Sequence, residues 1–151
     1  MEFIIIEGHK YFRGGFTSSK EVLECKGDGT EENPVMIDSS QKLPEVFSIR
    51  DSKLHVILRN FTAKQVTLFY VQNTKFEECN IRGLILFNSN FNKIINSTFK
   101  WNLNFNDSNN NSVENSSINK IRLNRSNHNR FKNCEISKIK INQSQKNSFN
   151  P

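Results

Sequence analysis

Acidic residues are the first candidates for catalysis in this 151-residue chain, because glycoside-cleaving enzymes hold two carboxyl groups about 5–9.5 Å apart. The candidates are four dispersed glutamates: Glu77, Glu78, Glu114 and Glu135. Their spacing assembles no such pair. Asp107 precedes Arg125 by 18 residues, one period of the repeat described below, and this favours a salt bridge between stacked coils. We therefore assign no catalytic residue.

Metal and disulfide chemistry would need the cysteines and histidines. These residues are Cys25, Cys79, Cys134, His9, His55 and His128. The cysteines lack Cys-x-x-Cys spacing and the histidines are scattered, so we expect neither a metal nor a cofactor. An odd number of cysteines is not a disulfide framework. We expect buried, free thiols at Cys79 and Cys134 and, because no signal peptide is recognisable, a cytoplasmic location.

Basic residues are concentrated near the end of the sequence. The formal net charge is +6, and residues 119–151 hold eight Lys or Arg residues against Glu135 alone. Such asymmetry can mark a surface that binds nucleic acid or another polyanion, or a solvated face that keeps a repetitive protein soluble. The candidate polyanion-binding residues are Arg122, Arg125, Arg130, Lys132 and Lys140.

Asparagine is unusually abundant, with 23 residues, of which 21 lie between Asn73 and Asn150. An ordinary apolar core has no use for so many amides. The chain is therefore either partly disordered or built so that polar side chains stack. Thirteen Phe and only nine Gly and Pro residues argue against disorder. No apolar run approaches the ~18 residues of a membrane helix.

An internal repeat of 18 residues, with one extra residue near Asn102, explains this composition. Apolar residues recur in columns. The first column is Val66, Leu84, Leu103, Ile121 and Ile139, and the second is Leu68, Leu86, Phe105, Leu123 and Ile141. Polar columns run between them. They include Ser89, Ser108, Ser126 and Ser144, and Asn92, Asn111, Asn129 and Asn147.

Apolar residues two positions apart face the same side of a short strand. Three such strands in 18 residues cannot pair with each other, but each can pair with its equivalent one repeat later. The pattern predicts three parallel sheets wound into a coil, with about 4.8 Å between coils. We expect the Asn column at a turn, because Asn tolerates left-handed backbone angles and stacked amides can hydrogen-bond along the axis.

Residues 121–136, IRLNRSNHNRFKNCEI, resemble the repeats of right-handed parallel β-helices of the pectin-lyase-like superfamily. Residues 27–37, GDGTEENPVMI, are similar to the segment that leads into the first coil of such proteins. The resemblance implies a right-handed winding. It does not imply one function, because the superfamily contains lyases, hydrolases, epimerases, tail spikes and non-catalytic modules. Left-handed β-helices and pentapeptide-repeat coils are the alternative folds.

The expected organisation is a β-helix of about six coils over residues 25–151, preceded by an N-terminal cap over residues 1–24. Within the cap, residues 3–7 read as a strand. Residues 18–25 read as a short helix, with Ser18 or Ser19 as its N-cap.

Two apolar surfaces are candidates for a protein partner. Phe69 and Phe87 fall on one outward column and Ile85 on its neighbour, so they form an exposed patch unless the N-terminal strand or helix covers them. Trp101 lies at the inserted residue, which suggests a turn, and it either covers this patch or stacks on a ligand. Ile141 and Phe149 lie near an open end of the core, which a partner or a second copy could cover.

We therefore expect a non-catalytic module that engages a protein partner or itself through the last coil. Binding of nucleic acid or an acidic glycan through the basic residues is the second hypothesis. A small carbohydrate-active enzyme is the third.

Overall fold

The computed structural model describes residues 2–7, 10–14, 21–23, 26–38, 43 and 45–150. These residues form strands and turns but no helix, and hence no helix able to cross a membrane. The long strands are β5 (Val46–Arg50), β7 (Thr62–Phe69), β9 (Asn80–Phe87), β11 (Thr98–Asn106), β13 (Ser117–Asn124) and β15 (Glu135–Asn142). The short strands are β4 (Val35–Ile37), β6 (Val56–Arg59), β8 (Thr74–Glu77), β10 (Lys93–Ile95), β12 (Ser112–Glu114), β14 (Arg130–Lys132) and β16 (Ser148–Asn150).

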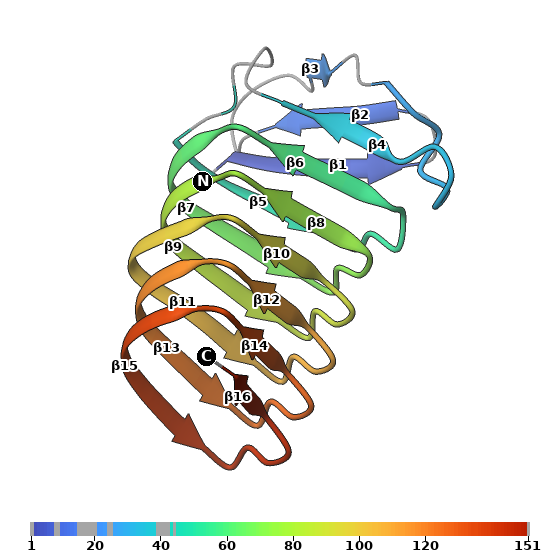
Figure 1. The fold of residues 1–151 in the computed structure, drawn as a ribbon. Helices are drawn as coiled ribbons and strands as arrows, with labels where there is room; N and C mark the ends of the chain where they lie inside the picture. The colour runs from blue at the N-terminus through green and yellow to red at the C-terminus, as the bar shows by residue number, and fades with distance from the viewer. Residues whose placement is uncertain are drawn as a thin grey trace.

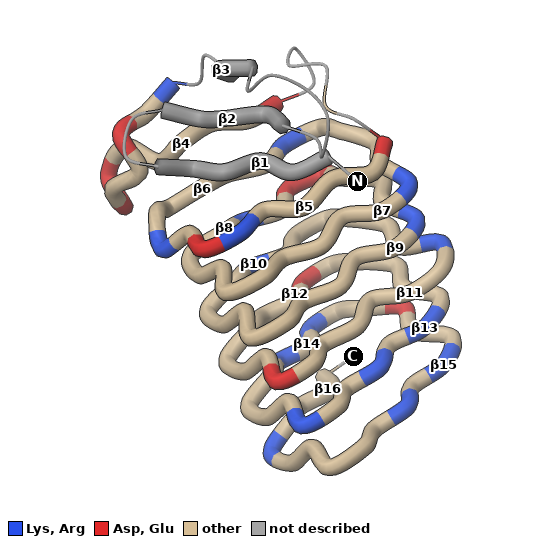
Figure 2. The backbone as a smooth tube through the Cα atoms, turned by 180° about the vertical axis from the view of Figure 1, so that it is seen from behind, with Lys and Arg blue, Asp and Glu red and all other residues tan. Residues whose placement is uncertain are grey.

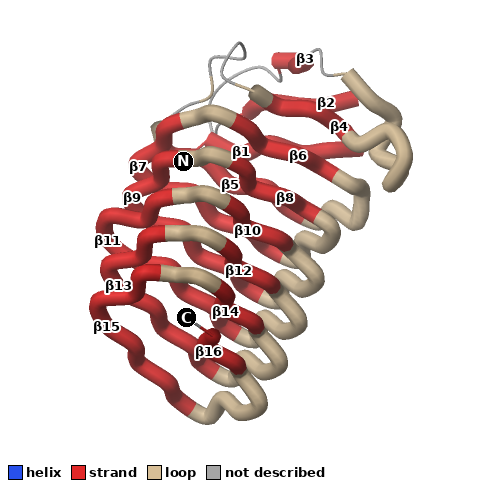
Figure 3. The backbone as a smooth tube through the Cα atoms, in the orientation of Figure 1, coloured by secondary structure: helices blue, strands red, loops and turns tan. Residues whose placement is uncertain are grey.

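Each coil contributes one long and one short strand, and each strand pairs in parallel with its equivalents in the neighbouring coils (Figures 1 and 3). The long strands belong to a nine-stranded sheet and the short ones to a seven-stranded sheet. The chain is therefore a parallel β-solenoid of about six turns, which confirms the expected architecture. Its expected right-handed winding stays a prediction.

The expectation of three sheets is wrong, because two of the expected strands run together into one. In β13 and β15, Ile118 pairs with Ile136 and Lys120 pairs with Lys138, so pairing lapses only at Asn119. The same single lapse occurs at Lys64, between β7 and β9. The chain turns this corner within one residue and does not break the ladder.

The core is the stack of inward columns that the repeat predicts. Val66, Leu84, Leu103 and Ile121 are 0% exposed, and they lie opposite one another in register along β7, β9, β11 and β13. Full burial of such a side chain contributes about 1.5–3 kcal/mol. Each coil can bury these residues only against its neighbours, so stability comes from stacking.

Each coil from β7 to β14 bends at three residues with positive φ, and the equivalent residues of successive coils form three columns. The first column is Asp51, Tyr70, Asn88, Asp107, Arg125 and Gln143; the second is Asn73, Phe91, Asn110, His128 and Lys146; the third is Asn60, Glu78, Asn96, Asn115 and Asn133. The expectation that the column of Asn92 is left-handed is wrong. The positive φ falls one residue earlier, at Phe91 and its equivalents.

The residue after each bend points inward and holds the backbone of the preceding coil. The Val71 amide donates to Ser89 Oγ at 3.1 Å, the Cys79 amide to Ser97 Oγ at 3.1 Å and the Thr74 amide to Asn92 Oδ1 at 3.0 Å. An unpaired buried amide costs about 1–3 kcal/mol. These polar columns therefore satisfy backbone groups that turns inside a solenoid would otherwise leave unpaired.

Residues 27–34 form the turn that leads into β4. Gly27 has a φ of +98°, and a Cβ there would lie 2.0 Å from the Pro34 carbonyl oxygen. The His55 amide donates to the Gly29 carbonyl at 2.9 Å, which ties this turn to the next coil. The positive φ and the close contact with Pro34 both require glycine at position 27.

The N-terminal strands extend the nine-stranded sheet. They are β1 (Glu2–Glu7), β2 (Lys10–Gly14) and β3 (Glu21–Leu23). β1 pairs in parallel with β5, and β2 and β3 follow in antiparallel order. The strand expected at residues 3–7 is confirmed. The helix expected at residues 18–25 is wrong where β3 lies, and Ser18, Ser19 and Cys25 lie outside the described residues. The division into a cap and a β-helix stays a prediction.

Candidate polyanion-binding face

The outward face of the nine-stranded sheet changes character along the solenoid. Side chains alternate along β13, so Ile121 and Leu123 point inward while Lys120, Arg122 and Asn124 point outward. Equivalent outward positions in the early coils carry Ser48 and Thr67, which are buried. Toward β15 the same positions become cationic (Figure 2).

Four cations on this face stand in two stacked pairs, and we call them the basic face. Lys120 lies in register with Lys138, and Arg122 with Lys140, on the adjoining strands β13 and β15. Parallel strands are about 4.8 Å apart, so like charges are held close together. None of the four forms an ion pair with another described residue. The basic face therefore carries positive charge that its described surroundings leave uncompensated.

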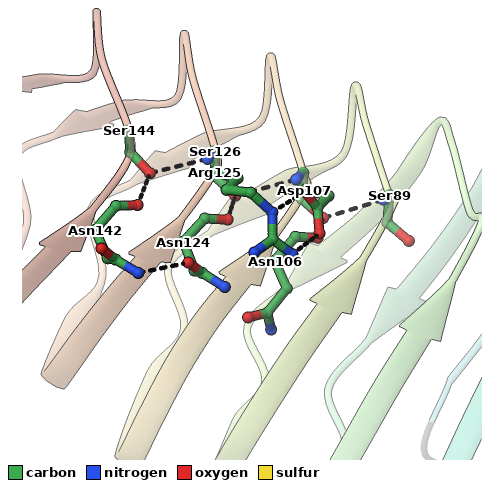
Figure 4. A network of polar contacts seen from close by, with 9 residues as sticks. Ser89, Asn106, Asp107, Asn124, Arg125, Ser126, Asn142 and Ser144 are labelled. Atoms are coloured by element: carbon green, nitrogen blue, oxygen red, sulfur yellow. Dashed lines mark hydrogen bonds and ion pairs between the residues drawn. The ribbon is translucent and has the colours of Figure 1, made fainter.

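A shallow groove of about 350 Å³ runs between these cations and a row of amides. Its lining comprises Asn104, Asn106, Arg122, Leu123, Asn124, Lys140 and Asn142. Asn142 donates its amide to Asn124 Oδ1 at 2.9 Å (Figure 4). Asn104 Oδ1 is shielded from solvent and has no hydrogen-bond partner. The groove thus presents cations and side-chain amides together.

The structure brings together only two of the five cations singled out from the sequence, Arg122 and Lys140. Arg125 is committed elsewhere: its Nε and Nη2 donate to the two carboxylate oxygens of Asp107, each at 2.7 Å (Figure 4). This confirms the expected salt bridge. The hydrogen bonds from Arg125 lower the pKa of Asp107, and those to Asp107 raise the pKa of Arg125.

Arg130 and Lys132 lie on β14 in the seven-stranded sheet, away from the basic face. Lys120 and Lys138 were missed as site residues. The signal was present, because each lies two positions before a chosen cation, Arg122 or Lys140, and so shares its side of the strand.

Two of the four glutamates considered for catalysis, Glu77 and Glu114, form ion pairs with neighbouring cations. Glu77 accepts from Lys75 Nζ and from Arg59 Nε, both at 2.9 Å. Lys75 is the larger cause of the lowered pKa of Glu77. Glu114 lies 3.5 Å from Lys93. No cluster of three or more His, Cys, Asp or Glu residues suited to a metal occurs within the described residues.

The candidate partner surface of Phe69, Ile85 and Phe87, here called the aromatic patch, is half-buried because its own side chains pack on one another. The rings of Phe69 and Phe87 stack at 5.2 Å and 7°, and the Arg50 guanidinium lies 4.4 Å from the Phe69 centroid. Ile85, in the same patch, is also half-buried. The expectation that the N-terminal strand covers this patch is wrong, because β1 pairs edge to edge with β5 and extends the sheet.

Trp101 lies within β11. The expectation that it lies in a turn is wrong. The pairing of β11 shifts register beside Trp101 against both β9 and β13, so the extra residue is accommodated as a β-bulge. Trp101 is 50% exposed, and the Arg82 guanidinium lies 5.4 Å from its ring centroid. Phe87 pairs with Asn106 at the other end of β11, so Trp101 does not cover the aromatic patch.

The last coil leaves apolar side chains accessible. Ile139 and Ile141 are 48% and 51% exposed, whereas their equivalents in the preceding coil, Ile121 and Leu123, are at most 1% exposed. Phe149 stacks on Phe131 at 4.8 Å and 4°. A cavity of about 190 Å³ beside them is lined by Phe131, Cys134, Ile136, Phe149 and Asn150.

Cys79 and Cys134 are free thiols, as expected. Cys79 is buried, and burial raises its pKa to about 11. Cys134 is only half-buried, contrary to expectation, because it lies where the last coil begins. Burial raises its pKa as well. Cys25 lies outside the described residues.

Comparison of the chain with protein-family models, with curated proteins and with solved structures found no match.

Proposed function

We propose that this chain is a non-catalytic β-solenoid module that binds a polyanion, a nucleic acid or an acidic glycan, along its basic face. The observation that carries the proposal is the stacking of Lys120 on Lys138 and of Arg122 on Lys140, without an ion pair to any described residue. Two close pairs of like charges are unfavourable in the free protein. An anionic polymer laid across them relieves that repulsion.

The physical basis is release of counterions. Each cation that neutralises a backbone anion releases a condensed ion, so affinity falls steeply with salt. Four contacts from the basic face predict a slope of log K against log salt of about −3. Arg125 contributes less, because Asp107 already neutralises it.

Binding is favoured over catalysis by the ionisation of two described carboxylates, Asp107 and Glu77. Cations lower the pKa of Asp107 and of Glu77, so these groups stay ionised at neutral pH. A general acid instead needs a raised pKa.

The test compares two matched double variants. Arg122→Glu with Lys140→Glu reverses half of the basic face. Arg130→Glu with Lys132→Glu makes the same change of charge on β14. We expect the first pair to weaken binding of heparin and of a labelled oligonucleotide at least ~10-fold at low salt, and to reduce the salt slope by about 2. Equal losses in both variants, or no binding by the wild-type chain at ~50 mM salt, would overturn the proposal.

A second candidate function is association with a protein partner or a second copy through the last coil. The half-exposed Ile139 and Ile141 favour it, because β15 ends the sheet and can accept another strand. Light scattering over a range of concentrations tests self-association, and a lysate pull-down tests a partner. Ile141→Asp should abolish either association, whereas Asn142→Asp, which adds the same charge on the outward side of β15, should not. A monomer that retains no partner counts against this candidate.

We also propose the right-handed winding and the pectin-lyase-like relationship that the repeat suggested, together with a cytoplasmic location. The likeness of residues 121–136 to those repeats supports the first two, and the unpaired thiols of Cys79 and Cys134 agree with the third. A crystal structure that shows left-handed coils would contradict the winding.

A further inference from the structure

We propose that the polyanion is a single-stranded nucleic acid, and that Trp101 stacks on one of its bases beside the basic face. This inference rests on the proposed function and names the ligand class. It starts from the β-bulge in β11, which the regular coil does not require.

The bulge is what presents Trp101 outward. β9 and β13 both pair regularly with β11 on either side of the register shift, so the sheet absorbs one extra residue without losing its ladder. Half of the Trp101 side chain remains exposed. Bulges commonly redirect a side chain toward a binding site.

Trp101 lies within β11, two residues before Leu103, at the level where the basic columns begin. Leu103 pairs with Ile121, so the residues just before them, Asn102 and Lys120, are neighbours on adjoining strands. Lys120 in turn lies in register with Lys138. Arg82 approaches the Trp101 ring from β9. The Trp101 ring on β11 therefore has a cation against it from β9, and the column of Lys120 and Lys138 begins on the next strand, β13.

An exposed ring among cations suits a single strand better than a duplex. Unstacked bases offer flat faces that pack on Trp, while the flanking Lys and Arg side chains neutralise the phosphates. Duplex bases are already stacked on one another, so their faces are closed to Trp101 and only their edges and the phosphates can be contacted. The amides of Asn106 and Asn142, which line the groove, can pair with the edges of unstacked bases.

The experiment uses the intrinsic fluorescence of the wild-type chain, because Trp101 is its single tryptophan. The probes are a ~12-nucleotide single-stranded oligonucleotide, the same sequence as a duplex, and a heparin oligosaccharide. We expect the single strand to quench Trp101 and to bind more tightly than the duplex. Trp101→Ala should weaken single-strand binding about 10-fold and leave heparin binding unchanged, and Trp101→Phe should restore most of the loss.

Tyr70→Ala is the matched control, because Tyr70 is an equally accessible aromatic residue, 60% exposed, at a bend of the coil. It should leave all three affinities unchanged. Circular dichroism of each variant establishes that the solenoid is intact. Binding of all probes without quenching and without an effect of Trp101→Ala overturns this inference but leaves the proposed function standing. Quenching by heparin alone assigns the site to an acidic glycan and also overturns it. Failure of every probe to bind the wild-type chain overturns both.

Discussion

Asn129 holds Asn111 through one side-chain oxygen, which accepts the backbone amide of Asn111 at 3.0 Å and its side-chain amide at 3.1 Å. The Asn129 amide then donates to the Ser108 carbonyl at 3.0 Å and to Asn147 Oδ1 at 3.1 Å. Both asparagines are at most 3% exposed. One side chain thus links three coils, and no water is needed to satisfy its polar atoms.

Replacement of this residue is the first prediction. Asn129→Ala should lower the free energy of unfolding by about 3 kcal/mol, because it leaves the Asn111 amide and the Ser108 carbonyl buried and unpaired. Asn119→Ala, at an exposed corner position, should change it by less than ~0.5 kcal/mol. Urea denaturation measures both. A loss for Asn129→Ala no larger than for Asn119→Ala would mean that the column contributes little.

The second prediction concerns the bends. Phe91 has a φ of 57° and is 57% exposed, so it carries the cost of a left-handed backbone without burying its ring. Phe91→Gly should raise the free energy of unfolding by about 1 kcal/mol. Arg130→Gly, within strand β14, should lower it by about 1 kcal/mol. Thermal denaturation measures the contrast, and a decrease for Phe91→Gly would count against strain at this position.

The third prediction is a pH dependence at Asp107. Arg125 holds the pKa of Asp107 below its ordinary value in the folded chain. The pair therefore stabilises the fold above the ordinary pKa of an aspartate, and this stabilisation is lost as the pH falls through the lowered pKa. Asp107→Asn should cost less than ~1 kcal/mol at neutral pH, because the pair is largely exposed.

Asparagine suits this comparison, because it tolerates the positive φ of 49° at Asp107. The stabilities of the variant and the wild-type chain, measured by urea denaturation, should converge in acid. A difference that persists unchanged down to pH ~2 would assign it to the turn and not to the ion pair.

The fourth prediction is that the two described thiols differ in reactivity. Cys79 should react with an alkylating reagent at least ~10-fold more slowly than Cys134 at neutral pH, because it is buried and its pKa is raised to about 11. Mass spectrometry of a Cys25→Ser variant follows each site by its peptide. Both thiols should react alike after denaturation, and faster alkylation of Cys79 in the native chain would contradict its placement in the core.

Much of the fold could be predicted from the sequence, because residues that share a column of the repeat lie in register on neighbouring strands. Val66, Leu84 and Leu103 were aligned by periodicity alone, and the strands pair them in that order. The number of sheets could not be predicted in this way. Whether a corner interrupts a strand depends on the backbone at one residue, such as Asn119, and the apolar columns on either side look the same in both cases.

Less of the candidate site could be predicted, because charge counts along the chain do not say which sheet a residue faces. Arg130 and Arg122 are close in sequence but lie on different sheets. Arg125 counts as a cation in the sequence, although Asp107 one coil earlier neutralises it. The repeat in the sequence showed the extra residue near Trp101. A coil can accommodate an insertion at a bend or within a strand, and only the register of strand pairing distinguishes the two.

The inward serine and asparagine columns set the order in which the coils complete their hydrogen bonds during synthesis. Ser108 Oγ accepts the amide of Ser89, and Ser144 Oγ accepts that of Ser126 (Figure 4), so these amides of each coil are satisfied only once the following coil is in place. A ribosome delivers the chain from its N-terminus. These bonds of each coil can therefore form only after about 18 further residues have been synthesised. At ~5–20 residues per second, this takes one to a few seconds.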